Sequence, residues 1–243
     1  MDLNGKIAIV TGGATGIGFG IARALVEAGC RVAIGSRNAA AVERAVHDLS
    51  AVGSCDGRTL DVSNRDSVGE FFAWVRSELG ESDILVNNAG MNVRDRRLDA
   101  LSADDWQQML QTNATGAFYC LQQVLPAMRA RRDGLVVNIV STAGRRAGPL
   151  GGPGYSASKF AMAALGIAAA LEVKDEGVRV SNIYPGEVNT PILDRRPVPV
   201  SDEHREQILQ PEDVAAAVLM IARLPARAHV PELVIKPTTQ PHD

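Results

Sequence analysis

Short apolar runs alternate with longer helical patterns along almost the whole chain. The runs are rich in valine and isoleucine and are bounded by glycine, asparagine or aspartate, which is typical of buried strands. They occupy residues 6–11, 31–36, 55–60, 84–87, 134–141, 178–184 and 232–235. Helical patterns fill the intervals at residues 18–27, 39–51, 65–79, 103–131, 155–175 and 211–222. Strands that alternate with helices form a parallel sheet covered on both faces, so the sequence predicts an α/β fold with a doubly wound parallel β-sheet of about seven strands.

The organisation of the chain is that of one unit. A length of 243 residues allows one large domain or two small ones, but no linker, repeat or low-complexity tract interrupts the alternation. We therefore predict a single domain over residues 1–243. The irregular stretch 190–202 carries Pro191, Pro197 and Pro199 and is expected to cross the top of the sheet as a loop. Long loops of this kind are often lids, and we expect residues 190–209 to cover a substrate.

Composition and charge exclude several classes of protein. The net charge is −3 and no basic stripe is present, which argues against a nucleic-acid partner. Cys30, Cys55 and Cys120 are odd in number and widely spaced, so they predict no metal site and no disulfide framework. The apolar stretch 160–171 is too short to span a bilayer, and no secretion signal opens the chain. We expect a cytoplasmic protein with reduced thiols and no membrane contact.

A glycine-rich turn follows the first predicted strand and opens the first predicted helix. Glycines allow a backbone to approach a pyrophosphate closely, and the helix N-terminus supplies N–H donors and positive potential. The residues expected to contact such a group are Gly12, Thr15, Gly16, Ile17 and Gly18. The alternative is a tight turn that needs glycine for its geometry alone. The strand–turn–helix context favours a dinucleotide site.

The end of the second strand, Ser36 and Arg37, indicates which dinucleotide binds. A carboxylate at this place would hold a ribose 2′-hydroxyl and repel a 2′-phosphate, and none is present. Arg37 offers a planar cation that suits phosphate, which favours NADP over NAD, although it could be only a solvated charge. After the third strand, Asp61 and Val62 are placed to meet the adenine. Asp61 is equally suited to cap the turn that follows.

Tyr155 and Lys159 are four residues apart in a predicted helix and therefore share one face of it. A nearby positive charge lowers the pKa of a phenol, and an acid/base group works best when its pKa is near the working pH. The pair is therefore a candidate for proton transfer. For an arbitrary pair at this spacing, a partly buried aromatic beside a solvated lysine is the simpler interpretation.

These motifs occur in a fixed order from the first strand to about residue 235. The ordered set comprises Thr11 and Gly12 with Gly16 and Gly18, the segment 87–90 (Asn-Asn-Ala-Gly), Asn113, Ser141, Tyr155 with Lys159, and Pro185 with Gly186. It strongly resembles the short-chain dehydrogenase/reductase family. The resemblance implies a Rossmann-type sheet and an NADP-dependent oxidoreductase that interconverts a carbonyl and a secondary alcohol by hydride transfer.

The resemblance also implies roles for individual residues. Asn113 would interrupt a long helix and hold a proton-relay water near the lysine. Ser141, with Thr142 as an alternative, would bind the substrate oxygen. Tyr155 would be the acid/base, and Lys159 would lower its pKa and bind the ribose. Further cofactor contacts are implied for Asn88, Ala89, Gly90, Pro185, Gly186, Val188 and Thr190.

The substrate is less constrained. The segment 229–238 lacks the C-terminal pattern of 3-oxoacyl-carrier-protein reductases and is similar to the branch that oxidises serine, other 3-hydroxy acids or small alcohols with NADP. An arginine reaching the site would suit a carboxylate or phosphate, and the candidates in the predicted substrate loops are Arg94, Arg96, Arg97, Arg195 and Arg196. A 3-oxoacyl-carrier-protein reductase and a non-enzymatic NADP-sensing regulator remain alternatives. The helices at 114–131 and 155–175 often pair in this family, so a homodimer or homotetramer is expected.

Overall fold

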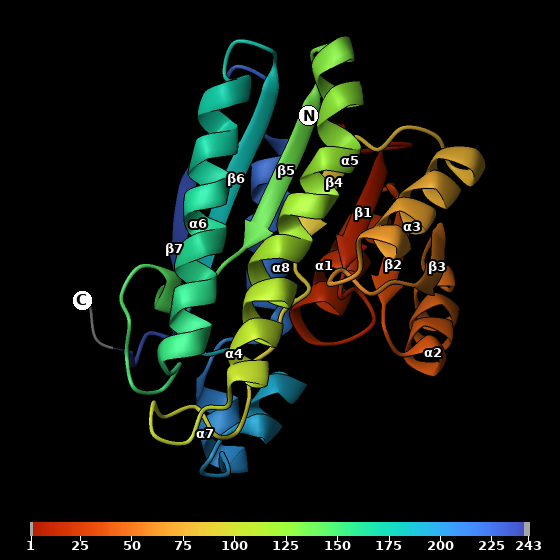
Figure 1. Cartoon of the computed structure of the whole chain (residues 1–243). Coiled ribbons are helices and arrows are strands. Elements are labelled where there is room, and N and C mark those ends of the chain that lie inside the picture. The colour runs from red at the N-terminus through yellow and green to blue at the C-terminus, as the bar shows by residue number, and fades with distance from the viewer. Residues whose placement is uncertain (1, 241–243) are drawn as a thin grey trace.

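The computed structural model describes residues 2–240 and contains one seven-stranded parallel sheet in the order β3-β2-β1-β4-β5-β6-β7 (Figure 1). The strands are β1 (Ile7–Thr11), β2 (Arg31–Ser36), β3 (Cys55–Thr59), β4 (Ile84–Asn87), β5 (Gly134–Ile139), β6 (Val178–Pro185) and β7 (Glu232–Ile235). All neighbouring strands pair in parallel. The predicted doubly wound fold is confirmed.

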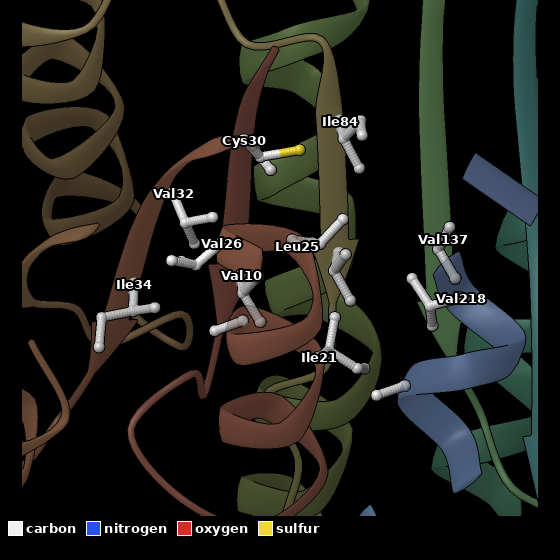
Figure 2. Packing of buried hydrophobic residues seen from close by; sticks show 14 of the residues in the cluster. Val10, Ile21, Leu25, Val26, Cys30, Val32, Ile34, Ile84, Val137 and Val218 are labelled. Carbon is white, nitrogen blue, oxygen red and sulfur yellow. The ribbon is translucent and has the colours of Figure 1, made fainter. Parts of the chain in front are cut away.

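Helices cover both faces of this sheet. They are α1 (Gly16–Glu27), α2 (Ala39–Ser50), α3 (Arg65–Glu78), α4 (Ala103–Leu110), α5 (Gly116–Arg131), α6 (Pro153–Val173), α7 (Asp202–Gln207) and α8 (Pro211–Arg223). One apolar core joins α1, α2 and α8 to the sheet, and a second joins α3, α5 and α6 to the opposite face. In Figure 2, Ile21 and Leu25 of α1 lie among valines and isoleucines of the strands, with Val218 of α8 beside them.

Alternation within β1 explains why both cores form. Ala8 and Val10 belong to one core, whereas Ile9, between them, belongs to the other. Successive side chains of a strand point to opposite faces, so an entirely apolar run is buried on both sides. The sequence of β1 therefore requires helices above and below it.

Two segments differ from the prediction made from hydrophobic periodicity, and in the first of them the interruption lies at Asn113, as the family resemblance implies. The helix expected over residues 103–131 is divided into α4 and α5 by a π-helical turn at Gln111–Thr115. The expected loop at 190–202 contains a short 3-10 helix, Pro191–Arg195, and leads into α7. Ser201 begins α7 because its hydroxyl accepts a hydrogen bond from the backbone N–H of His204 (3.2 Å).

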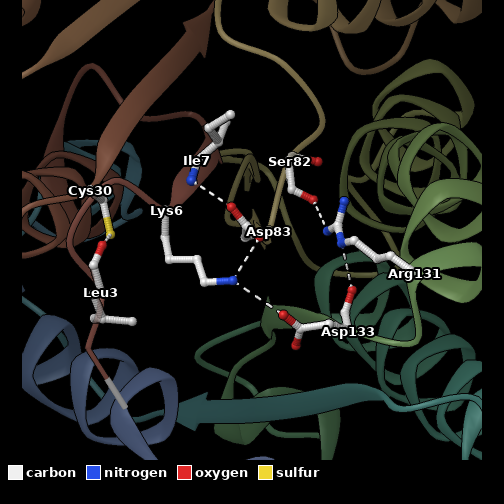
Figure 3. A network of polar contacts seen from close by, with 8 residues as sticks. All are labelled: Leu3, Lys6, Ile7, Cys30, Ser82, Asp83, Arg131 and Asp133. Carbon is white, nitrogen blue, oxygen red and sulfur yellow. Dashed lines mark hydrogen bonds and ion pairs between the residues drawn. The ribbon is translucent and has the colours of Figure 1, made fainter.

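An ionic network fixes the amino ends of the central strands (Figure 3). The ammonium of Lys6 donates to Asp83 (3.0 Å) and Asp133 (3.2 Å), and Asp83 also accepts from the backbone N–H of Ile7 (2.8 Å). These residues directly precede or begin β1, β4 and β5. The network lies at the edge of the sheet opposite to the carboxyl ends of the same strands, where the site described below is located.

Helix α6 carries the apolar stretch that was judged too short to cross a membrane. The helix itself has 21 residues and, within residues 2–240, is the one helix long and apolar enough to do so. Lys159, Met162 and Val173 on it are nevertheless buried against the rest of the molecule. It is therefore a core helix that packs on the sheet, although Phe160, Ile167 and Leu171 on its outer face are exposed.

Candidate active site

A cavity of about 590 Å³ opens at the carboxyl ends of the strands. In doubly wound sheets, ligands bind at this edge, and the volume is suitable for a cofactor together with a small substrate. Of the residues predicted to form the site, those that line the cavity are Gly12, Thr15, Gly16, Ile17, Ser36, Arg37, Asp61, Val62, Asn88, Ala89, Gly90, Ser141, Tyr155, Lys159, Pro185, Gly186, Val188 and Thr190. Gly18 and Asn113 are not among the lining residues.

The turn after β1 has the shape that a pyrophosphate requires. Gly12 (φ +64°) and Gly16 (φ +55°) adopt backbone conformations that favour glycine. Thr15, the N-cap of α1, makes no side-chain cap, so it leaves the first N–H groups of the helix available to a ligand. Gly18 packs against this turn from behind, where a Cβ would overlap the Gly12 carbonyl and the Asn88 amide. We therefore expect Gly18 to shape the turn without contacting the cofactor.

The segment after β4 is bonded to the same turn. Thr11 Oγ1 accepts hydrogen bonds from the backbone N–H groups of Asn88 (3.0 Å) and Ala89 (3.1 Å). The Asn88 side chain donates in return to the carbonyls of Thr11 (2.9 Å) and Gly12 (3.2 Å). Both loops are thus held at fixed spacing, and Gly90 lies close to the Lys159 ammonium.

Arg37 lines the cavity directly after the end of β2. Its side chain is exposed, and between residues 2 and 240 it makes no hydrogen bond or ion pair. Asp61, which follows β3 and also lines the cavity, accepts hydrogen bonds from the backbone N–H (2.9 Å) and the hydroxyl (2.6 Å) of Ser63. The Asp61 carboxylate thus caps the turn between β3 and α3, and Asn64 caps α3 itself. A cation without a partner at this end of the cavity fits the phosphate of a dinucleotide.

Tyr155, Lys159 and Ser141 line the same part of the cavity and form its candidate catalytic corner. Tyr155 is the third residue of α6, and Lys159 follows one helical turn later with its ammonium 5.8 Å from the centre of the tyrosine ring. The ammonium donates to the carbonyl of Ile139 at the end of β5 (2.9 Å). Ser141, two residues further on, lines the same cavity as Tyr155 and acts to lower the pKa of the Tyr155 hydroxyl. A hydroxyl pair therefore faces the cavity above a buried lysine.

Burial controls the protonation of this corner. It lowers the pKa of Lys159 to about 7. It also raises the pKa of Tyr155, an effect partly offset by Ser141 and by the positive charge of Arg96. The expectation that Lys159, together with the oxidised cofactor ring, lowers the tyrosine pKa stays a prediction for the cofactor-bound state. Desolvation outweighs the neighbouring charge, and the cation that acts on the phenol is Arg96.

Asn113 lies in the π-helical turn and is fully buried. Its amide accepts from the N–H of Met91 (2.7 Å) and donates to the Met91 carbonyl (2.9 Å) and to Ser158 (2.9 Å). Its Oδ1 and the Lys159 ammonium both lie close to Gly90, each 3.4 Å from where a Cβ there would be. The side chain thus ties the 87–91 loop to α6, and a role toward a relay water stays a prediction.

The predicted substrate arginines separate into two groups. Arg96, Arg195 and Arg196 line the cavity. Arg94 is exposed, and Arg97 pairs with Asp99 at the surface. Arg146, which is not among the named arginines but belongs to the segment 144–154 that the sequence predicts to face the substrate, also lines the cavity. Arg196, in the segment predicted to be a lid, donates to Glu187 (2.6 Å), which is also hydrogen-bonded to His204 (2.5 Å).

The pKa of Lys159 leads to a prediction about stability. Between pH 7 and 10.5 the unfolded chain holds a proton on this lysine that the folded chain has lost. The free energy of unfolding should therefore rise with pH across this window, and Lys159→Met should remove that rise. Urea unfolding of the cofactor-free protein at several pH values measures the difference. Lys174→Met, which alters an exposed lysine after the same helix, should keep the wild-type profile; parallel profiles for all three proteins would contradict the assignment.

Comparisons with known proteins agree with this geometry. A family model described as short chain dehydrogenase matches residues 6–198. The alcohol dehydrogenase of the archaeon Thermococcus sibiricus, complexed with 5-hydroxy-NADP, has a TM-score of 0.88 and 32% identity over 98% of this chain and 99% of that one. The closed form of a serine dehydrogenase complexed with NADP⁺ has a TM-score of 0.88 and 32% identity over 97% and 96%.

A fungal relative is more similar in sequence but much longer. Glycine betaine reductase ATRR of Emericella nidulans is 36% identical over 248 residues, which cover 98% of this chain and 19% of that protein. The resemblance deduced from the ordered motifs is confirmed. The chain belongs to the short-chain dehydrogenase/reductase family, whose members are oxidoreductases that use NAD or NADP and act on small molecules.

Proposed function

We propose that the protein is an NADP-dependent oxidoreductase that interconverts a carbonyl and a secondary alcohol, with Tyr155 as the acid/base. The observation that carries the proposal is the hydroxyl pair of Tyr155 and Ser141 in the cavity into which the glycine-rich turn also opens. Proton transfer requires the acid within hydrogen-bond reach of the reacting oxygen, and a carbonyl oxygen placed between the two hydroxyls meets this condition.

NADP is the cofactor that the lining residues fit. The N-terminus of α1, with Gly12, Thr15 and Gly16, would hold the pyrophosphate, and Arg37 would pair with the 2′-phosphate. Both solved neighbours described above contain NADP or a derivative of it, which supports this choice. When bound, the nicotinamide supplies or accepts the hydride.

The protein residues manage the proton. During reduction, negative charge grows on the substrate oxygen, and Ser141 stabilises it by donating a hydrogen bond. Tyr155 gives its proton to that oxygen, and its raised pKa keeps the phenol protonated at neutral pH until it does so. Lys159, with a pKa of about 7, can take either protonation state and is placed one helical turn away. Asn113 acts by fixing the loop that carries Gly90 against α6.

A small hydroxy acid or alcohol is the proposed substrate class. The similarity to an alcohol dehydrogenase and a serine dehydrogenase supports it. A homodimer or homotetramer is proposed from apolar side chains left exposed on the outer face of α5 and α6, namely Phe118, Phe160, Ile167 and Leu171. Substrate turnover tests the first proposal, and the molecular mass in solution tests the second.

The test is a substrate panel followed by NADPH absorbance. Small ketones, 3-hydroxy acids and acyl thioesters are offered to the protein, with NADPH for reduction or NADP⁺ for oxidation. We expect turnover of a small ketone or hydroxy acid and little turnover of thioesters. Preferred turnover of an acetoacetyl thioester would indicate a 3-oxoacyl-carrier-protein reductase. NADPH binding with no turnover of any carbonyl would overturn the enzymatic proposal and favour an NADP-sensing regulator.

A further inference from the structure

Arg96 is a buried cation in the wall of the cavity. It lies in the loop between β4 and α4, its side chain is packed against Gly152, and only 7% of the residue is exposed. Its guanidinium donates to three backbone carbonyls, those of Val93 (3.0 Å), Leu150 (2.7 Å) and Arg195 (2.8 Å). Each carbonyl belongs to a different loop around the cavity, and none carries a charge.

No carboxylate in residues 2–240 neutralises Arg96. The acidic residues that line the cavity are Asp61 and Glu187. Asp61 follows β3 and is bonded to Ser63, and Glu187 is already paired with Arg196 and His204. The charged or ionisable groups close enough to act on Arg96 are Arg196, which is another cation, and Tyr155. Arg96 is therefore a positive charge without a counter-ion.

Burying a guanidinium without a counter-ion destabilises the folded protein unless an anion binds to it. Removing an unpaired charge from water is strongly unfavourable, and carbonyl dipoles replace only part of its hydration. A guanidinium has five N–H groups, and three are used by the carbonyls. Two remain, one on each terminal nitrogen, and charge-assisted bonds to a carboxylate are the strongest that they can form.

We propose that Arg96 binds the carboxylate of an anionic substrate, so that the enzyme selects small oxo and hydroxy acids over neutral ketones and alcohols. The proposal rests on the function proposed above, because Tyr155 must define where the reacting carbon lies. Arg146 and Arg195 line the same cavity with no ion-pair partner in the described part of the chain, and they add positive potential that favours an anion.

Two structural roles compete with this one and make different predictions. If Arg96 only holds the three loops together, its loss should impair acidic and neutral substrates alike. If it only adjusts the pKa of Tyr155, its loss should shift the pH profile of kcat equally for both kinds of substrate. A role in binding the carboxylate instead changes the ratio between an acid and a neutral analogue with the same reacting carbonyl.

The experiment measures that ratio. Small oxo acids of several chain lengths are compared with their methyl esters, and kcat/KM is determined for wild type, Arg96→Gln, Arg96→Lys and Arg94→Gln. The wild type should prefer the best acid by roughly 10- to 100-fold, the range expected for hydrogen bonds to a charged group. Arg96→Gln should bring the ratio close to one, and Arg96→Lys should restore part of it. Arg94→Gln removes the same charge from an exposed position in the same loop and should leave the ratio unchanged.

A binding measurement covers the case of slow chemistry. Titration calorimetry with malonate and with malonamide, in the presence of NADP⁺, should give tighter binding of malonate to the wild type and equal binding of both to Arg96→Gln. Turnover with equal rates for acid and ester in the wild type would overturn the Arg96 proposal and leave the proposed function intact. Selective malonate binding without turnover of any carbonyl would support anion binding by Arg96 and overturn the proposed function.

Discussion

Replacing Tyr155 by phenylalanine is expected to lower kcat by about 10²- to 10⁴-fold, the range that a positioned acid/base contributes. The substitution removes only the hydroxyl. The ring that packs at the start of α6 and lies beside the Lys159 ammonium is kept, so the fold and the cavity should persist. Cofactor affinity should change by no more than a few-fold, which NADPH fluorescence titration measures alongside steady-state turnover.

A matched control distinguishes this loss from a general effect of deleting a phenol. Tyr119 on α5 does not line the cavity, and Tyr119→Phe should leave kcat unchanged. Near-normal turnover in Tyr155→Phe would show that another group transfers the proton. Loss of NADPH binding together with activity would instead assign Tyr155 mainly to the cofactor.

The fold was largely predictable because its determinants are local and repetitive. A strand such as β1, which is apolar from Ile7 to Val10, must be covered on both faces. The turn after it needs positive φ angles at Gly12 and Gly16, which glycine adopts readily. The division of the helix at Gln111–Thr115 was foreshadowed by the family motif but not by the periodicity of the sequence. It depends on Asn113 bonding to Met91 and Ser158, which lie far away along the chain.

The chemistry of the site was less accessible to sequence reasoning. Spacing places Tyr155 and Lys159 on one face, but the direction of each pKa depends on how deeply the folded chain buries them. Similarly, the sequence alone does not distinguish Arg94, Arg96 and Arg97, which lie within one short loop. The structure separates them, because only Arg96 turns inward onto the carbonyls of loops that arrive from later in the chain.

Arg37 should decide between the two nicotinamide dinucleotides. We expect Arg37→Asp to shift the ratio of kcat/KM for NADPH over that for NADH by roughly 100-fold or more toward NADH. The variant loses a charge-assisted bond to the 2′-phosphate and adds a repulsive carboxylate, which can accept a hydrogen bond from the 2′-hydroxyl of NADH. Steady-state kinetics with both cofactors and one fixed substrate measure the ratio.

The position of Arg37 makes this result interpretable. Its side chain is exposed and has no partner in residues 2–240, so its replacement removes no contact that supports the fold. Arg44 on α2 is also exposed but does not line the cavity, and Arg44→Asp makes the same change of charge at a nearby point of the chain. Selectivity should respond to the first substitution and not to the second. An equal response to both would show that preference follows the overall potential of this end of the sheet, and no response would mean that the 2′-phosphate is bound elsewhere.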